Sequence, residues 1–594
     1  MRSAAPKPSP RVTNAALNGS LLFLSAAALV TQTLAVREVL ALTGGNEIII
    51  GLVFGVWFFW SGVGAAVAGW WRLGERLRPG ILCFASTLGA GWLPLALVFM
   101  ARLGASWLET ADGRLTGLWH AASGVVLLLA PAPLLSGLLF AAMAAARNPT
   151  EGGQGASSAA RFSWDALGAA IAGALFTFVL AGRFPALSIG ASMGVAGSVA
   201  GAVLALAVGV RPRLAAVAVA CLPVVCGAAL LSIASLDELD YALHTRRPRF
   251  ASGHETLIAA RESRYQQLLW TYYRRQDTVY GDGEAVATYP DQESTTAEAH
   301  FVACLAPQLR RVLVAGAAPG TPVRELLRHR PERIDVVELD PEVLALLRYS
   351  LSREDKAALA DPAVRIHTAD LPGFLLQASA GDYDLIWLQP PAPSSVQANR
   401  FYTVEFFQRA ARVLNERGAL TFTTVGAPNY LGPVMADYLG TIHAAVKDAF
   451  PFVRVLPGSH ERFLAAGQPG VLPAGPDDAV ARFEGRKLEV PGFTSQVFQL
   501  LWEPDQEAKR AAELEALGRV PANRDLQPRA MLAYLRIWNR YGSSDAADIG
   551  DGTALRADRS RVWAALLPLA VVLLLLAVFV ARRFRATNET FVVP

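Results

Sequence analysis

The chain has little cysteine and little charge for its 594 residues, with four cysteines and only 18% Asp, Glu, Lys and Arg. Cys83, Cys221 and Cys226 fall in apolar runs, and Cys304 stands apart from them. This spacing excludes a disulfide framework and a zinc site of the usual cysteine pattern, so no metal is expected. Hydrophobic residues make up 53% of the chain, which is too much for a soluble protein of this size. The composition therefore points to a membrane protein with several domains.

An excess of basic residues is also lacking, since the formal net charge is only +4. The arginines are largely explained by membrane topology, so we expect no nucleic-acid partner. The first apolar run, 17–36, is too long for the core of a signal peptide, and no clean small-x-small cleavage site follows it. We expect this run to be retained as a membrane span.

Long apolar runs are what the chain has instead. About 20 apolar residues are needed to cross the hydrocarbon core of a bilayer, and eight runs qualify. Seven precede a polar region and one follows it: 17–36, 48–71, 81–101, 121–146, 163–182, 184–209, 214–234 and 562–581. The fourth run contains Pro131 and Pro133, which predict one kinked helix. Small residues in 62–66 and 168–173 predict close packing of helix backbones.

The basic residues that flank these runs orient the spans. With the N-terminus inside, the inside segments hold thirteen basic residues, and short outside loops hold four, namely Arg37, Arg102, Arg114 and Arg183. Seven preceding spans then place residues 235–561 on the extracytoplasmic face of a bacterial-type inner membrane, with both termini cytoplasmic. The runs hold few ionisable groups, with Asp165 at the cytoplasmic end of the fifth, so a transporter is the least favoured function.

From Ile258 onward the pattern is that of an α/β protein. Residues 266–280 predict a β-hairpin, and four later strands alternate with helices, which predicts a mainly parallel Rossmann-like sheet of the class I methyltransferase type. The predicted organisation has seven parts: a cytoplasmic tail 1–16, a seven-helix transmembrane domain 17–234, a linker and small β-domain 235–311, the Rossmann-like domain 312–470, a C-terminal extension 471–561, a transmembrane helix 562–581 and a cytoplasmic tail 582–594.

The carboxyl ends of the predicted strands carry groups suited to a nucleoside. Gly316 and Gly320 follow the first strand and leave the backbone room to approach a ligand. Glu338 ends the second strand, where its carboxylate can accept hydrogen bonds from both ribose hydroxyls. Asp370 follows the third strand and can accept one from an adenine amino group. A glycine loop followed by two acids in these positions predicts a nucleoside site.

Several segments resemble the spermidine synthase family: 312–316, 324–329, 337–340, 361–364, 383–386 and 401–407, preceded by 263–266 and the hairpin. Two more, 429–431 and 523–525, are similar to its multi-helix membrane branch, often called fused transporter/spermidine synthase proteins. The resemblance covers residues 258–470. It implies that Gln266, Glu338 and Asp370 hold decarboxylated S-adenosylmethionine, or S-adenosylmethionine itself.

The chain departs from this family where the acceptor would react. The loop after the fourth strand reads Asp-x-x-Asp-Pro in the family, and here Gln389 and Ala392 replace both aspartates. Pro319 replaces an aspartate of the glycine loop, and residues 296–297 replace a Tyr-His pair before Glu298. A diamine must lose a proton before its nitrogen attacks carbon, and glutamine cannot accept that proton. A buried diamine also requires paired carboxylates.

Two interpretations follow. The favoured one is a catalytically degenerate domain that serves as a binding or assembly module on a membrane anchor, with or without a cofactor, in a membrane complex or a homodimer. The alternative is an active aminopropyltransferase, or another S-adenosylmethionine-dependent transferase with a different acceptor. Its acceptor pocket would be built from four residues: Glu298, Gln389, Tyr402 and Glu405. His300 and His329 are expected to be packing or surface residues.

Overall fold

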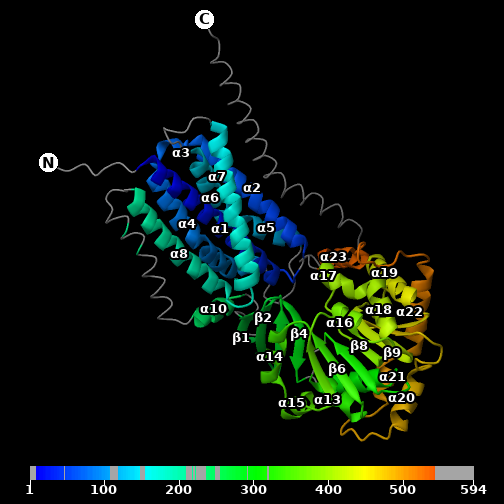
Figure 1. The fold of residues 1–594 in the computed structure, drawn as a ribbon. Coiled ribbons are helices and arrows are strands. Elements are labelled where there is room, and N and C mark those ends of the chain that lie inside the picture. The colour runs from blue at the N-terminus through cyan, green and yellow to red at the C-terminus, as the bar shows by residue number, and fades with distance from the viewer. Residues whose placement is uncertain are drawn as a thin grey trace, which may run out of the picture.

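The computed structural model describes residues 9–45, 47–107, 118–146, 154–208, 236–247, 255–290, 292–316 and 320–541, with residues 217, 221 and 250. These residues form a helical bundle and an α/β region that meets one end of the bundle (Figure 1). Of the predicted spans, 214–234 and 562–581 lie outside the described residues, apart from residues 217 and 221.

The bundle contains five helices, within the described ranges, that are long and apolar enough to cross a membrane. They are α1 (Pro10–Leu42), α2 (Ile48–Trp70), α4 (Pro79–Leu103), α7 (Gln154–Leu175, extended by the π-turn Phe176–Leu180) and α8 (Ala186–Val208). A sixth candidate is the pair α5 (Leu118–Leu129) and α6 (Pro131–Ala145), bent by 44° at the break. This bend confirms the kink predicted from Pro131. Short helices complete the bundle: α3 (Leu73–Arg76), the 3₁₀ turn Gly104–Trp107 and α10 (Leu236–His244).

Glycines allow the bundle helices to approach closely, as predicted. A Cβ atom on Gly64 of α2 would lie 2.0 Å from the carbonyl oxygen of Leu134 in α6. A Cβ atom on Gly168 of α7 would lie 2.2 Å from the carbonyl oxygen of Leu22 in α1. Backbones in direct contact gain dispersion energy and exclude larger side chains from these positions.

Two arginines that the sequence assigned to outside loops lie in helices instead. Arg37 is part of α1, and Arg102 is part of the last turn of α4, where it is buried. The loop position was wrong because both helices continue past their apolar runs, and there Arg102 binds carboxylates within the protein. The side of the membrane that the two arginines face stays a prediction. Asp165 also finds an internal partner, the hydroxyl of Ser25 in α1.

The α/β region begins with the predicted small β-unit. Four antiparallel strands pair in chain order: β1 (Thr256–Glu262), β2 (Gln267–Tyr273), β3 (Gln276–Gly281) and β4 (Glu284–Tyr289). The β-favouring segment 267–273 is buried at its start, from Gln267 to Leu269, and exposed at its end, at Tyr272 and Tyr273. The core of this sheet packs against a helix of the next domain through Leu268, Val279 and Leu347.

A seven-stranded sheet of order β10-β11-β9-β8-β5-β6-β7 follows. Its strands are β5 (Arg311–Ala315), β6 (Arg333–Glu338), β7 (Val364–Thr368), β8 (Tyr383–Leu388), β9 (Leu414–Val425), β10 (Phe452–Leu456) and β11 (His460–Ala466). The first five are parallel neighbours, and β11 pairs antiparallel with β9 and β10. The strand order reverses beside β5, which creates a ligand crevice at the carboxyl edge of such sheets.

Helices cover both faces of this sheet. One core gathers α16 (Leu371–Gln377), α18 (Val404–Val413), α19 (Pro433–Ala449) and α23 (Arg529–Tyr541). The other gathers α12 (Gln292–Ala303), α13 (Thr321–Arg328), α20 (Pro476–Gly485) and α21 (Val497–Leu501). The remaining helices are α14 (Pro341–Ser350), α15 (Arg353–Leu359), α17 (Val396–Asn399), the 3₁₀ turn Arg400–Tyr402 and α22 (Pro504–Ala516). The Rossmann-like core therefore also contains residues of α12 and of the segment after residue 470. Both lie outside the range 312–470 that the sequence indicated.

Candidate site at the carboxyl edge of the sheet

The glycine loop and the loop after β8 meet at the reversal of strand order. Gly316 has a φ of +69°, and a Cβ atom there would lie 2.5 Å from the carbonyl oxygen of Gln389. Only glycine fits this contact. Gly320 packs against Leu351 and Tyr289, where a Cβ atom would be 2.4 Å from the leucine side chain. Both glycines thus admit neighbouring protein atoms closely. Pro319 lies outside the described residues.

Glu338 and Gln266 belong to one hydrogen-bonded network. The side-chain amide of Gln266 donates to Asp340 Oδ2 at 3.1 Å, and the backbone N–H of Asp340 donates to Glu338 Oε1 at 2.9 Å. Burial raises the pKa of Glu338, and the nearby charge of Asp340 adds to this effect. The small β-unit, through Gln266, and the end of β6, through Glu338, therefore lie on one side of the candidate site. The sequence had not indicated Asp340 as the link.

Asp370 lies at the end of the neighbouring strand and is held by an arginine. The backbone N–H of Ala369 donates to the carbonyl of Glu338 at 3.1 Å, which keeps the two strand ends adjacent. Arg400 donates to Asp370 through both terminal nitrogens, with Nη1 3.1 Å from Oδ2. The sequence did not indicate this arginine, because thirty residues separate it from Asp370 and no periodic pattern relates the two. A ligand amino group at Asp370 would share the carboxylate with Arg400.

The two glutamates proposed for an acceptor pocket both have structural partners. Glu298 on α12 forms an ion pair with Arg462 of β11. Glu405, in the first turn of α18, lies 3.5 Å from Arg524 and accepts a hydrogen bond of 3.1 Å from the backbone N–H of Asp525. These contacts join segments that are distant in the chain, so each glutamate contributes to the fold of the α/β region.

Tyr402 binds the loop after β8, in which Gln389 and Ala392 stand where the spermidine synthase family has aspartates. Its hydroxyl is buried and donates to the carbonyl of Pro391 at 3.0 Å. The backbone N–H of Gln389 donates to the carbonyl of Ala315 at 2.9 Å, and Ala392 is partly buried. The proton of Tyr402 is thus directed at a backbone carbonyl, and the loop carries no carboxylate between residues 389 and 395.

Two carboxylates that the sequence did not indicate lie in the hairpin beside this site. Burial raises the pKa of Asp282 to about 6 and that of Glu284 to about 7, and in Glu284 the charge of Asp282 adds to the effect. Burial, followed by the charges of Tyr534 and Glu284, raises the pKa of Tyr402. The charge of Glu284 thus acts on the pKa of Tyr402, although the two residues are far apart in the chain. The only sequence signal was an acid at a strand start after a tight turn.

A buried ionic cluster joins the bundle to the β-unit. Arg102 donates to Glu38 Oε1 at 2.9 Å and Oε2 at 3.2 Å, and also binds Asp240 of α10. It donates to Glu262, the last residue of β1, at 2.9 Å. Glu262 also accepts from the backbone N–H of Ala186, which begins α8, at 3.1 Å. Burial, followed by the like charge of Glu38, raises the pKa of Glu262. Arg102 of α4 thus links α1, α10 and the end of β1, and Glu262 extends the cluster to α8.

Further contacts continue from this cluster to the candidate site. Arg37 of α1 donates to the carbonyl of Ser263 at 2.9 Å. The hydroxyl of Ser263 accepts from the backbone N–H of Gln266 at 3.0 Å, which sets the turn that presents Gln266. In the loop between α1 and α2, Glu47 accepts from the backbone N–H of Val396, the first residue of α17, at 2.9 Å. The bundle end therefore contacts segments on two sides of the site.

The two histidines that the sequence assigned to packing or surface positions lie between helices. His300 is fully buried, and its Nδ1 is 2.9 Å from Nε2 of His329. Arg486, which directly follows α20, donates to His329 Nδ1 at 2.7 Å. Because Arg486 can only donate, His329 donates through Nε2 and His300 accepts at Nδ1. Burial, and then the charge of Arg486, lowers the pKa of His329 to about 2. Both rings join α12, α13 and α20.

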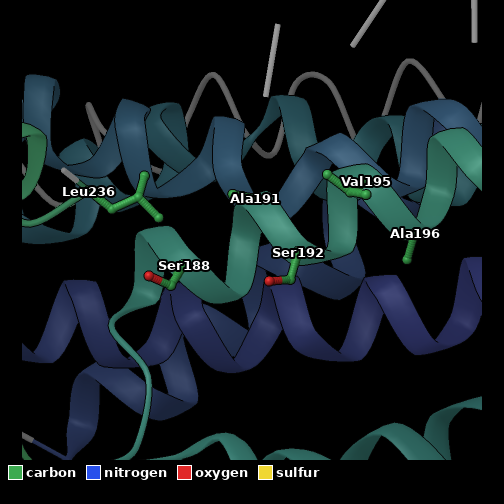
Figure 2. A pocket seen from close by; sticks show the side chains of 6 residues that line it. All are labelled: Ser188, Ala191, Ser192, Val195, Ala196 and Leu236. Carbon is green, nitrogen blue, oxygen red and sulfur yellow. The ribbon is translucent and has the colours of Figure 1, made fainter. Parts of the chain in front are cut away.

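A separate groove of about 450 Å³ lies on the bundle, along α8. Figure 2 shows Ser188, Ala191, Ser192 and Val195 of α8 lining it, with Leu236 at one end. Its walls are small or apolar residues, with two serine hydroxyls. None of the residues at the carboxyl edge of the sheet lines this groove, so the groove and the candidate site are distinct places.

The α/β region is similar to proteins of a known family. Residues 294–465 match the family model of the spermine/spermidine synthase domain. The polyamine aminopropyltransferase of Corynebacterium efficiens is 30% identical over 175 residues, which cover 29% of this chain and 34% of that protein. The enzyme of the same name from Clostridium acetobutylicum is 28% identical over 160 residues, or 26% of this chain and 54% of that protein. The chain thus spans about a third to a half of these relatives.

Among solved structures, the spermidine synthase of Thermotoga maritima is 20% identical, with a TM-score of 0.36 over 44% of this chain and 87% of that chain. A spermidine synthase in complex with the transition-state analogue AdoDATO gives 20% identity and a TM-score of 0.37 over 44% and 89%. The seven-stranded sheet, with the antiparallel four-stranded sheet before it, confirms the predicted fold class. The C-terminal part of this chain contains a spermine/spermidine synthase domain, and several long apolar helices precede it.

Proposed function

We propose that this chain is a membrane-anchored binding module that holds an adenosyl ligand at the carboxyl edge of its synthase-like sheet and does not transfer an aminopropyl group. The observation that carries the proposal is the loop after β8, which offers Gln389 and Ala392 where a proton acceptor is required. The two acids of the expected acceptor pocket support it, because Glu298 and Glu405 each bind an arginine.

Retention of the nucleoside side of the site supports the binding half of the proposal. Glu338 ends a parallel strand at the reversal of strand order, where ribose hydroxyls are bound in such sheets. Gln266 is set by a turn that Arg37 of the bundle contacts through Ser263. A ligand that orders Gln266 would therefore also act on the end of the bundle, which suits a sensing or assembly role.

The proposal predicts binding without turnover. The purified full-length protein should bind S-adenosylmethionine, its decarboxylated form or methylthioadenosine in isothermal titration, yet form no spermidine from putrescine above a no-enzyme control.

The double variant Gln389→Asp/Ala392→Asp should gain measurable diamine affinity, because it restores two carboxylates to the acceptor side.

Glu284 favours the second candidate function, a transferase with a different acceptor. Its pKa of about 7 would suit a general base at neutral pH. Turnover by the wild-type protein that is lost in both Glu284→Gln and Glu338→Ala would establish this function and overturn the first. Binding without turnover for putrescine and for other amine acceptors would exclude it.

We also propose that the α/β region is extracytoplasmic, on the basis of seven spans and of thirteen inside against four outside basic residues. Arg37 and Arg102 lie at the bundle end that contacts the α/β region, and both have carboxylates or carbonyls as partners, so they place no free charge there. A reporter active only in the periplasm should be active when fused at residue 253 and silent after residue 594. The reverse pattern would place the domain in the cytoplasm.

A further inference from the structure

The outer face of α23 and the turn before it expose both leucines and arginines. Arg524 and Gln527 pair across a tight turn that leaves Leu526 95% exposed. On α23, Leu532 is 51% exposed. Exposed arginines lie on the same helical face at positions 529, 536 and 540, since these positions and 532 are three or four residues apart. The opposite face of α23 is buried in the core through Ala530, Ala533 and Ile537.

Contacts place this surface beside the end of the bundle. The backbone N–H of Met531 in α23 donates to Asn399 of α17 at 3.1 Å. The other end of α17, Val396, is bound to Glu47 of the loop between α1 and α2. Only one short helix therefore separates α23 from the bundle. Figure 1 shows α17 and α23 on the side of the α/β region that faces the bundle.

We infer that the outer face of α23 and the turn 524–527 rest on the bilayer surface and bind anionic phospholipid headgroups. Leu526 and Leu532 would enter the membrane interface, and the arginines at 529, 536 and 540 would pair with lipid phosphates. Arg536 also contacts Asp437 at 3.0 Å, so it is partly neutralised within the protein. The inference rests on the proposed membrane anchorage. It adds that the domain itself lies on the membrane through this face of α23.

Probes at single cysteines test this contact in the full-length protein. Cys221 and Cys226 are first replaced by alanine, so that the probe cannot react with them. Cys83 and Cys304 are kept, because they are buried and do not react with the probe. A fluorescent probe is then attached in Leu526→Cys or Leu532→Cys, and the protein is placed in nanodiscs that contain brominated lipid. We expect roughly twofold quenching, stronger with phosphatidylglycerol than with phosphatidylcholine. The charge reversal Arg529→Glu/Arg540→Glu should abolish the difference between the two lipids.

Two controls separate the possible failures. Leu500 is 77% exposed on α21, a helix that Figure 1 shows on the side of the α/β region away from the bundle, so a probe in Leu500→Cys should stay bright. Phe178 is 70% exposed on the π-turn that extends α7, so a probe in Phe178→Cys reports whether the bundle is embedded. Quenching at 178 without quenching at 526 and 532 would overturn the inference and leave the anchorage intact. Equal quenching at 500 would also overturn it, whereas no quenching at 178 would contradict the anchorage itself.

Discussion

Replacing Glu338 by glutamine is expected to lower the affinity of the full-length protein for S-adenosylmethionine and methylthioadenosine about 10- to 100-fold. In the proposed site this carboxylate would accept charge-assisted hydrogen bonds from a ribose, and such bonds contribute roughly 1.5–3 kcal/mol each. Glutamine keeps the size of the side chain but removes its charge and one acceptor oxygen. Isothermal titration of both proteins measures the loss directly.

The pH dependence of binding gives this prediction a second readout. Burial raises the pKa of Glu338, so the carboxylate is protonated at a higher pH than in an exposed glutamate. Ligand affinity should therefore fall as the pH is lowered, and the Glu338→Gln variant should show a flatter profile. Glu342, exposed in the first turn of α14, provides the matched control Glu342→Gln. An unchanged affinity in Glu338→Gln would place the nucleoside elsewhere.

Replacing Arg102 by alanine is expected to destabilise the joint between the bundle and the α/β region by about 3–5 kcal/mol. The substitution leaves Glu38, Asp240 and Glu262 close together in a buried site without their common cation. A thermal midpoint lower by about 10 °C should follow, since about 1 kcal/mol shifts the midpoint by about 2–4 °C for domains of this size. Arg102→Lys should recover only part of it, because one ammonium cannot replace the planar guanidinium at three carboxylates.

Arg72 offers the comparison for this experiment. It forms an ion pair with Glu75, 2.6 Å away, but its side chain is exposed. Exposed ion pairs contribute about 0–1 kcal/mol, so Arg72→Ala should shift the midpoint little. If Arg102→Ala and Arg72→Ala lower the midpoint equally, the buried cluster does not hold the two parts of the molecule together.

Of the candidate site, only the positions of two acids were predictable. Glu338 and Asp370 could be placed at neighbouring strand ends because parallel strands that alternate with helices all point the same way. The side chains that bind these acids and their neighbours could not be predicted from the alternation of strands and helices. Asp340 is an N-cap by local sequence, and its contact with Gln266 joins it to a different sheet. Arg400 reaches Asp370 from a 3₁₀ turn that carries no periodic signal.

The sequence by itself determined the features that depend on local pattern: the length of the apolar runs, the kink at Pro131, the alternation of strands and helices, and the edge where the acids gather. Only the tertiary structure decided how charges far apart in the chain pair with one another. Arg102 with Glu262, and Glu298 with Arg462, lie about 160 residues apart in sequence. Periodicity reports which face of an element is buried, and it holds no information about which distant charge that face will meet. Those pairings decide which carboxylates can act as a base, because a carboxylate bound to a guanidinium is a poor proton acceptor.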